Sequence, residues 1–195
     1  MPLVGFKKNS DRPKDDFYPT PESATRAMLA HIHIPEDVTI LEPSCGDGAI
    51  SKILEETHTV ISRDLENHGY GEIGQDFLKT TDWPEGRFWI ITNPPYNIAN
   101  DYVRKCLASP AERVILLLKW DYSGGSKSRE GILNIGKIQR VLLMKERVSF
   151  WPKGKERKGS PSYYSAWYIW DKRFTSDNPD EYMVRRISLK DGENK

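Results

Sequence analysis

Four consecutive residues, Asn93-Pro94-Pro95-Tyr96, combine groups that could bind a planar amino group. They follow residues 88–92, an apolar, β-prone run that predicts a buried strand. Each proline fixes φ and lacks a backbone N–H, so the turn after this strand is stiff and its carbonyl oxygens are free. An amide side chain, free carbonyl oxygens and an aromatic ring suit a flat, polar amino group. Consecutive prolines also serve simply to end a strand, so this motif alone leaves both interpretations open.

A glycine-containing turn earlier in the chain joins a second predicted strand to a helix. Residues 38–41 predict a short buried strand, and the run Glu42-Pro43-Ser44-Cys45-Gly46-Asp47-Gly48 leads into residues 49–54, whose apolar side chains have helical spacing. Such a turn lets a ligand approach the backbone at the carboxyl end of a parallel strand. The third glycine of the dinucleotide fingerprint is missing, and Asp47 would repel a pyrophosphate. The turn therefore favours a ligand with a positive centre over one with phosphates.

These motifs resemble those of S-adenosylmethionine (SAM)-dependent amino-methyltransferases of the N6-adenine type. Residues 42–48 resemble the cofactor motif of that family, and residues 93–96 resemble its catalytic motif. The segment Asp16-Phe17-Tyr18-Pro19-Thr20-Pro21-Glu22 resembles the segment that helps hold the methionine end of SAM. The three motifs occur in the family's order, and the resemblance covers residues 16–171. Small phage- and prophage-borne members look the most similar, because of residues 147–150 and 166–171.

The resemblance implies a role for each residue of the catalytic motif. The Asn93 side-chain oxygen and the Pro94 carbonyl oxygen would accept the two hydrogens of an exocyclic adenine amine. Pro95 would stiffen the turn, and Tyr96 would stack on the base. Two acceptors direct the nitrogen lone pair at the methyl group, so no general base with a shifted pKa is needed before transfer.

The resemblance also implies SAM as the cofactor and a set of residues that bind it. Asp64, after a predicted strand at residues 59–62, would hold the ribose hydroxyls, and Glu66 takes this role if the register slips. Asp76 would accept from the adenine amino group, and Phe77 would line or stack on the ring. The cofactor-binding set is Tyr18, Thr20, Pro21, Glu42, Pro43, Ser44, Cys45, Gly46, Gly48, Asp64, Asp76 and Phe77.

Basic and aromatic residues in the second half of the chain suggest contacts with nucleic acid. The net charge is only +1, but ten Lys/Arg residues and three acids lie between Lys137 and Arg173. Charge runs are usually solvated loops, and phosphate contact is the functional interpretation. The predicted substrate-binding set is Lys119, Trp120, Trp151, Lys153, Lys155, Arg157 and Lys158. If the substrate is a duplex, Trp120, Tyr122 or Trp151 could fill the gap left by a flipped base.

Alternating strands and helices predict an α/β fold with a mostly parallel sheet, and the resemblance makes this the Rossmann-like, seven-stranded fold of SAM-dependent methyltransferases. Residues 65–73 leave room only for a short strand. Two late strands, near residues 138–144 and 163–170, predict an antiparallel hairpin at one edge. Helices are expected at residues 99–107 and 21–31, the latter with Thr20 as N-cap and Pro21 at its first position.

One domain is expected at residues 16–195, preceded by a flexible arm at residues 1–15. Two cysteines, Cys45 and Cys106, offer no disulfide framework and suggest a reducing compartment. There is no secretory signal and no apolar run of membrane-spanning length, and the four histidines lack metal-ligand spacing. The sequence therefore predicts a cytoplasmic protein of a bacterium or phage-infected cell, with neither a metal nor a membrane partner.

Several substrates and one non-enzymatic role remain open. Adenine in DNA is favoured and adenine in RNA comes second. Glutamine methyltransferases usually carry a helical domain before the SAM motif, and the 37 residues that precede the first strand here disfavour them. Cytosine-N4 enzymes usually begin the catalytic motif with Ser, whereas this motif begins with Asn93. A non-catalytic binding subunit is the alternative from another class. Neither the stretch between Asp76 and Asn93 nor the 24 residues after Asp171 hold a separate target-recognition domain. The recognised target sequence is therefore short or loosely defined, a partner protein supplies the specificity, or the substrate is structured RNA.

Overall fold

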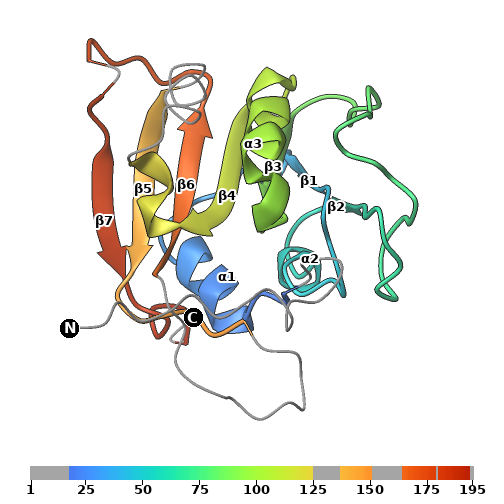
Figure 1. Cartoon of the computed structure of the whole chain (residues 1–195), viewed down its shortest axis with the longest axis horizontal. Helices are drawn as coiled ribbons and strands as arrows, with labels where there is room; N and C mark the ends of the chain where they lie inside the picture. Colours follow the sequence, from blue (N-terminus) through green and yellow to red (C-terminus); the bar gives the residue numbers. More distant parts are fainter. Residues whose placement is uncertain (1–17, 125–136, 151–163, 179, 194–195) are drawn as a thin grey trace, which may run out of the picture.

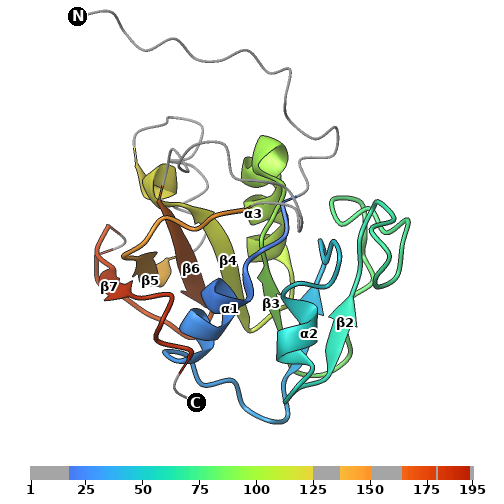
Figure 2. The ribbon, with the colours of Figure 1, turned by 90° about the horizontal axis from the view of Figure 1, so that it is seen from below.

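A seven-stranded sheet forms the centre of the molecule, and helices cover both of its faces (Figures 1 and 2). The computed structural model describes residues 18–124, 137–150, 164–178 and 180–193. The predicted arm at residues 1–15 lies outside these ranges. So do five members of the predicted substrate-binding set, which are Trp151, Lys153, Lys155, Arg157 and Lys158. Their roles stay predictions.

The sheet has a parallel half and a mixed half. In the order β2-β1-β3-β4-β6-β5-β7, the strands are β1 Thr39–Glu42, β2 Val60–Ser62, β3 Phe88–Thr92, β4 Arg113–Lys119, β5 Ile138–Met144, β6 Ser165–Asp171 and β7 Met183–Ile187. β2, β1, β3 and β4 are parallel, β6 lies antiparallel between β4 and β5, and β7 is parallel to β5. The predicted mostly parallel, seven-stranded sheet with an antiparallel pair is confirmed.

Two strands differ from the expectation. β7 has no counterpart among the predicted strands, because four of its five residues are exposed and adjacent arginines, Arg185 and Arg186, interrupt any apolar alternation. It pairs with β5 and so forms the edge outside the antiparallel β5–β6 pair. The short strand expected within residues 65–73 is reduced to a single bridge between Arg63 and Glu72. The total of seven strands is therefore reached with β7 in place of this short strand.

Three α-helices lie within the described ranges, two on one face of the sheet and one on the other (Figure 2). α1 (Glu22–Leu29) and α2 (Ser51–Leu54) pack into one core, and α3 (Ala99–Ala108) packs into the other. Short 3-10 turns, η2 and η3, occupy Tyr96–Ile98 and Trp120–Ser123. The helices predicted at residues 21–31 and 99–107 are confirmed to within two residues at each end.

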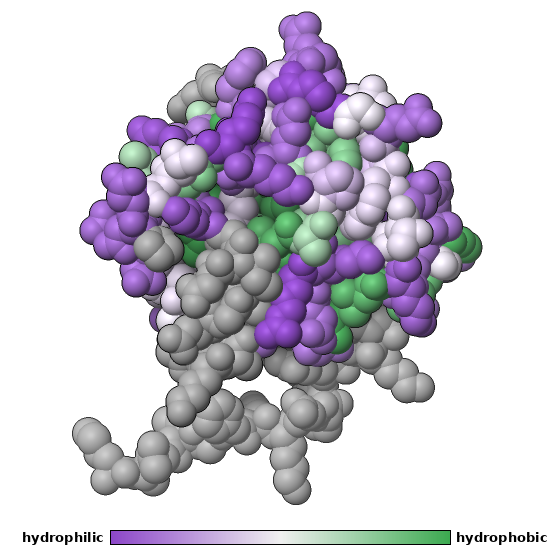
Figure 3. Space-filling view, turned by 90° about the horizontal axis from the view of Figure 1, so that it is seen from above, coloured by the Kyte–Doolittle hydropathy of each residue, from purple (hydrophilic) through white to green (hydrophobic). Residues whose placement is uncertain are grey.

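The two cores are separate because successive residues of a strand point to opposite faces of the sheet. In β3, Trp89 and Ile91 pack on the side of α1 and α2, while Phe88 and Ile90 pack on the side of α3. The same alternation continues through β4 and β6, whose inner residues are all buried. On the face seen in Figure 3, hydrophilic side chains surround a small apolar area. No helix of the described ranges combines the length and apolar character needed to cross a membrane.

Removing a central core side chain should test this packing. Leu116 of β4 is fully buried under α3, so Leu116→Ala should lower the free energy of unfolding by about 2–5 kcal/mol. Val184→Ala is the control, because Val184 is 44% exposed on β7 and should lose less than about 1 kcal/mol. Urea unfolding followed by circular dichroism measures both, and equal losses would contradict the described core.

Candidate functional site

A cavity of about 230 Å³ opens at the carboxyl ends of β1 and β3. Four segments line it: residues 18–20 ahead of α1, the turn after β1, residues 64–78 after β2, and the turn after β3 with the start of α3. Of the predicted site residues, the lining includes Asn93, Pro94, Pro95, Tyr96, Tyr18, Thr20, Glu42, Pro43, Ser44, Cys45, Gly46, Asp64, Asp76 and Phe77. Pro21 and Gly48, from the predicted cofactor set, do not line it.

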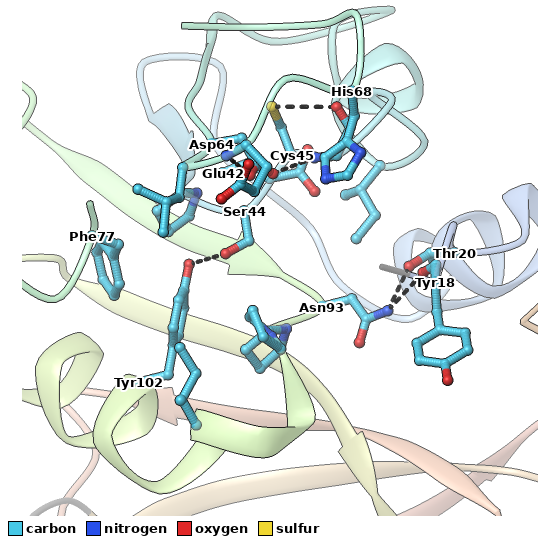
Figure 4. A pocket seen from close by; sticks show the side chains of 18 of the residues that line it. Tyr18, Thr20, Glu42, Ser44, Cys45, Asp64, His68, Phe77, Asn93 and Tyr102 are labelled. Carbon is cyan, nitrogen blue, oxygen red and sulfur yellow. Dashed lines mark hydrogen bonds between the residues drawn. The ribbon is translucent and has the colours of Figure 1, made fainter. Parts of the chain in front are cut away.

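The side chain of Asn93 is held in one orientation at the edge of this cavity (Figure 4). Its Nδ2 donates to Thr20 Oγ1 at 3.1 Å and, more weakly, to the Tyr18 carbonyl oxygen at 3.4 Å. Because a backbone carbonyl can only accept, the amide nitrogen must face Tyr18. The opposite atom, Asn93 Oδ1, is buried and has no hydrogen-bond partner in the described part of the chain. Asn93 Oδ1 is therefore a hydrogen-bond acceptor in a fixed position that no donor of the described residues satisfies.

Thr20 has a different role from the predicted one. Helix α1 begins after Pro21, which is its N-cap and provides no side-chain hydrogen bond. The expectation that Thr20 caps this helix is therefore wrong. Its hydroxyl instead accepts from Asn93, which lies 73 positions away in the sequence. A threonine next to a helix start looks like a cap locally, and only the fold shows that its oxygen is used across the cavity.

The two prolines give the turn after β3 its shape. Pro95 has φ −57° and ψ 122°, and its carbonyl oxygen accepts from the Ile98 N–H at 3.3 Å. The Pro94 carbonyl oxygen, in contrast, takes no backbone hydrogen bond from the described residues. Tyr96 follows on η2, with its ring edge-to-face against Phe150 at 6.4 Å between centroids. The turn thus places beside Asn93 an aromatic ring and a carbonyl oxygen that no backbone N–H of the described residues occupies. Sequence reasoning had singled out residues 147–150 without giving Phe150 a role.

The turn after β1 is closed by Asp64. Gly46 has φ 55°, a conformation that favours glycine, and its N–H donates to Asp64 Oδ2 at 2.7 Å. The second oxygen of Asp64, Oδ1, accepts from the Glu66 N–H at 2.9 Å. Each carboxylate oxygen can accept another hydrogen bond. Asp64 therefore both shapes the turn and keeps acceptors at the cavity, and its predicted contact with ribose stays a prediction.

Tyr102 of α3 reaches the same turn and was missed by the motif analysis. Its hydroxyl lies 2.5 Å from Ser44 Oγ, and both residues line the cavity (Figure 4). Burial raises the pKa of Tyr102 well above its ordinary value, so the hydroxyl stays neutral. Helical spacing indicates that Tyr102 is buried, but only the packing of α3 on the sheet brings it to the cofactor motif.

The charged groups around the cavity are nearly all acidic. The lining carboxyl groups are those of Glu42, Asp47, Asp64, Glu66 and Asp76, and no lysine or arginine is among the described lining residues. Lys79 pairs with Asp76 from outside at 2.8 Å and lowers the pKa of that carboxyl. Such a cavity attracts cationic ligands and repels phosphates. In the described ranges, no three His, Cys, Asp or Glu side chains are grouped to hold a metal ion.

The thiol of Cys45, which lines the cavity, is unsuited to nucleophilic chemistry. Burial and, to a lesser extent, the nearby Glu42 carboxyl raise the pKa of Cys45 to about 12. A thiol with so high a pKa is almost entirely protonated near neutral pH, and only the thiolate is nucleophilic. Cys45 therefore acts as a small packing residue beneath the cofactor motif.

Two members of the predicted substrate-binding set, Lys119 and Trp120, lie in the described residues, at the end of β4 and the start of η3. Lys119 Nζ is 5.8 Å from the centroid of the Tyr96 ring, and both residues line a second hollow of about 490 Å³ between α3 and η3. Trp120 does not line this hollow and packs against the core under α3. Tyr122 is buried edge-to-face against Tyr168, so it would have to leave the core to fill a gap in a duplex. This packing does not support Trp120 or Tyr122 as a base-replacing residue.

No family model matches the chain, and no curated protein matches it in sequence. Solved structures do match. The methyltransferase subunit of a type I restriction-modification system from Streptococcus thermophilus is 13% identical with a TM-score of 0.61, over 87% of this chain and 47% of that one. The chain thus spans about half the length of that subunit. The 23S rRNA methyltransferase ErmE is 20% identical with a TM-score of 0.54, over 77% of this chain and 67% of that one.

A third structure matches nearly the whole chain. It is a Listeria monocytogenes protein provisionally described as a class I SAM-dependent methyltransferase, 13% identical with a TM-score of 0.57, over 97% of this chain and 70% of that one. The fold is that of the SAM-dependent methyltransferases. The predicted fold class is confirmed. At these identities the likeness concerns the fold, and the assignment of the Asn93–Tyr96 motif to N6-adenine chemistry stays a prediction.

Gly48 tests how closely the loop after β2 packs on the cofactor turn. A Cβ added at Gly48 would lie 2.6 Å from the Tyr70 ring, whereas one added at Gly86 would meet nothing within 4 Å. Both glycines have positive φ, 79° and 72°. Gly48→Ala should therefore lose about 1–3 kcal/mol more unfolding free energy than Gly86→Ala. Urea unfolding provides the comparison. Equal losses would show that Tyr70 does not pack on this turn.

Proposed function

We propose that the protein binds SAM in the acidic cavity and transfers its methyl group to the exocyclic N6 amine of adenine in nucleic acid, with DNA favoured over RNA. The observation that carries the proposal is the geometry of Asn93. Its Nδ2 is used by Thr20 and Tyr18, and its buried Oδ1 lacks a donor in the described chain. A buried acceptor without a partner costs free energy, so it fits a site whose donor arrives with the substrate.

The cavity fits SAM in its charge and in its lining. Five carboxyl groups line it, and no described lysine or arginine does, so a ligand with a sulfonium and an ammonium group is favoured over a nucleotide carrying phosphates. Asp64 keeps acceptors for the ribose hydroxyls, and Asp76 and Phe77 would bind the adenine ring. Glu42 and Tyr18 lie toward the methionine end in this assignment. Bound SAM supplies a methyl group activated by the positive charge on sulfur.

The catalytic turn supplies orientation rather than a base. The Asn93 Oδ1 and Pro94 carbonyl oxygens accept the two N–H hydrogens of the substrate amine, which turns the nitrogen lone pair out of conjugation. Tyr96 stacks on the base and sets its distance from the turn. Thr20 and Tyr18 keep the Asn93 oxygen aimed at the amine. Because these groups are held before the substrate arrives, little reorganisation is needed during methyl transfer.

Both DNA and RNA enzymes occur among proteins with this fold. The Streptococcus thermophilus structure is a subunit of a DNA restriction-modification system, and ErmE is a 23S rRNA methyltransferase. The preference for DNA rests on the resemblance of the motifs. The Streptococcus thermophilus protein is one subunit of a larger system, which supports the proposal that a partner protein supplies target specificity. The alternative of a non-catalytic binding subunit is disfavoured, because the buried Asn93 Oδ1 lacks a donor in the described chain and Asn93 lines the cavity.

Product analysis tests the proposal directly. The protein is incubated with tritiated SAM and, separately, with unmethylated double-stranded DNA, single-stranded DNA and total RNA, and the products are digested to nucleosides. Labelled N6-methyldeoxyadenosine is expected, and its strand preference shows whether base flipping is required. Label only in RNA would move the assignment to the RNA alternative. SAM binding without label in any substrate would favour a scaffold, or an enzyme that needs a partner.

Substitutions at Asn93 and Thr20 should separate chemistry from cofactor binding. Asn93→Ala should lower the methylation rate by about 100-fold or more, because one of two acceptors is lost, while SAM affinity stays within a few-fold. Thr20→Val should cause a smaller loss, since the Asn93 amide can then rotate. Asn178→Ala, an exposed asparagine on the turn before β7, is the control. A fully active Asn93→Ala variant would contradict the assignment of this turn.

A further inference from the structure

Strand β7 forms an outer edge of the sheet, and Figures 1 and 2 show no described helix or strand beyond it. Four of its five residues are exposed. Met183 and Val184, at 58% and 44%, are among the exposed large apolar side chains of the described residues. A strand at an edge presents backbone N–H and C=O groups that can pair with a strand of another chain. Residues 180–187, here named the β7 edge, therefore form a candidate interaction surface.

The backbone of β7 directs its groups outward at every second residue. The Ile187 carbonyl oxygen accepts from the Lys145 N–H at 2.8 Å, so Ile187 turns its backbone groups toward β5. Pairing with β5 is regular from Met183 to Ile187, and backbone groups alternate in direction along a strand. Residues 183 and 185 therefore also face β5, whereas residues 182, 184 and 186 point their N–H and C=O groups away from the sheet. An incoming strand would bond to these three residues.

The charges on the β7 edge are ordered around Met183. Asp180 and Glu181 precede it by three and two positions, and Arg185 and Arg186 follow it by two and three. None of these four charged side chains forms an ion pair with another described residue. All four residues are exposed. The edge thus carries an acidic half and a basic half of equal charge, with an apolar residue at its centre.

We propose that the β7 edge binds a second copy of this chain, with the two β7 strands antiparallel about a two-fold axis at Met183. Such an axis places the acidic half of each copy opposite the basic half of the other. The facing residues are Met183 with Met183, Tyr182 with Val184, Glu181 with Arg185, and Asp180 with Arg186. Opposite charges that face each other across two strands attract, and like charges repel. Both arginines of each copy thereby gain an acidic partner.

Other two-fold registers leave the charges unmatched. Moving the axis to Val184 places Met183 opposite Arg185, and moving it to Arg185 places that arginine opposite itself. Backbone groups would match in all of these registers, because each keeps outward residues opposite outward residues. The side chains therefore select the axis at Met183. Charged residues on an edge ordinarily discourage pairing with foreign strands, and here they favour one partner and one register.

The two acids can make these contacts without giving up their own. Glu181 Oε1 accepts from Asn178 Nδ2 at 2.9 Å, but this donor is neutral and a carboxylate accepts several hydrogen bonds. The Asp180 N–H donates to Asn178 Oδ1 at 3.0 Å, which does not involve the Asp180 carboxylate. Because that N–H is already used, the backbone bonds between the copies would run between Tyr182 and Val184.

The pairing joins two seven-stranded sheets without covering the cavity of either copy. No residue of the β7 edge lines the cavity. β7 runs in the direction of β3, because β4 is parallel to β3, β5 and β4 are both antiparallel to β6, and β7 is parallel to β5. The two-fold axis reverses the second copy, so the two cavities would open at opposite edges of the joined sheet. The inference therefore does not rest on the proposed function. Only strand edges meet, so we expect a reversible dimer that weakens with salt.

Sedimentation of charge-reversed variants tests the pairing. The full chain should dimerise in a concentration-dependent way at low salt. Arg185→Glu places an acid opposite Glu181 twice in each dimer, so the dissociation constant should rise by about tenfold or more. Glu181→Arg should weaken the dimer in the same way, whereas Glu181→Arg combined with Arg185→Glu should restore it. Both side chains are exposed, so circular dichroism should show an unchanged fold.

Lys190→Glu is the control for these reversals. It changes the net charge as Arg185→Glu does, at an exposed residue outside the facing pairs, and should leave the dissociation constant unchanged. A wild type that stays monomeric up to about 1 mM overturns the inference. So does a double variant that dimerises no better than Arg185→Glu, because the two residues then do not face each other.

Cysteine crosslinking tests the register independently. At an axis through Met183 the two copies of this residue form a non-hydrogen-bonded pair with Cα atoms about 4.5 Å apart, within the range that a disulfide spans. Met183→Cys should therefore form a disulfide-linked dimer on mild oxidation. Val184→Cys should not, because its two copies would lie more than about 7 Å apart. The native cysteines, Cys45 and Cys106, are buried and should not react.

Non-reducing electrophoresis measures the linked dimer, and linkage by Met183→Cys well above that by Val184→Cys is the expected result. Linkage by Val184→Cys alone would show a different register, and equal linkage by both would show random collision. Either of these results overturns the inference, as does the absence of linkage in both variants.

Discussion

The parallel pairing of β1 with β3 is the constraint on which the site depends. Ile40 lies opposite Trp89 and Leu41 opposite Ile90, so both strands end at the same edge of the sheet. The cofactor turn and the catalytic turn therefore open into one cavity, although β2 and a long loop separate them in the sequence. Because side chains alternate along a strand, a shift of one residue would exchange the side chains that β3 presents to the two cores. The fully buried residues of β3 hold this register.

A second contact, between α1 and β6, supports the orientation of the Asn93 amide. Trp167 Nε1 donates to the Ala24 carbonyl oxygen at 3.0 Å and anchors α1 on the sheet. The segment ahead of α1 then carries Thr20 and Tyr18 to Asn93. A buried strand thereby holds the segment that orients the Asn93 amide. Core packing and catalytic geometry are linked through this helix, and loosening α1 would release the amide.

The charge around the cavity suits a cationic cofactor and not a phosphate backbone. Acidic groups surround the cavity and favour a cation, but the same groups would repel a phosphate backbone. Two basic residues, Lys119 and Arg104, line the second hollow outside this cavity, together with the acids Asp101 and Asp121. The phosphates of a polyanionic substrate would therefore stay outside the acidic cavity, and only an uncharged base would enter it.

The sequence by itself determined most of the strands and helices and the motifs at the two turns that follow β1 and β3. The apolar runs of β3 and β4 predict buried strands, prolines at Pro94 and Pro95 predict a stiff turn, and glycines predict the ligand turn after β1. These are properties of neighbouring residues, so a local pattern suffices to detect them. The mostly parallel order follows from alternation of strands with helices, and the grouping of both motifs at one edge follows from that order.

Only the tertiary structure decided which partner each polar group has. Thr20 looks like a helix cap but serves Asn93, and β7 joins the sheet despite its exposed, arginine-containing sequence. Tyr122, which stood among the candidates to replace a flipped base, is buried in the core. Hydrogen bonds from Ser51 to Glu42 and to Ser62 likewise join residues of β1, α2 and β2 that no sequence pattern connects. The physical reason is the same in each case: these interactions join residues far apart in the chain, and their partners are chosen by packing rather than by local preference.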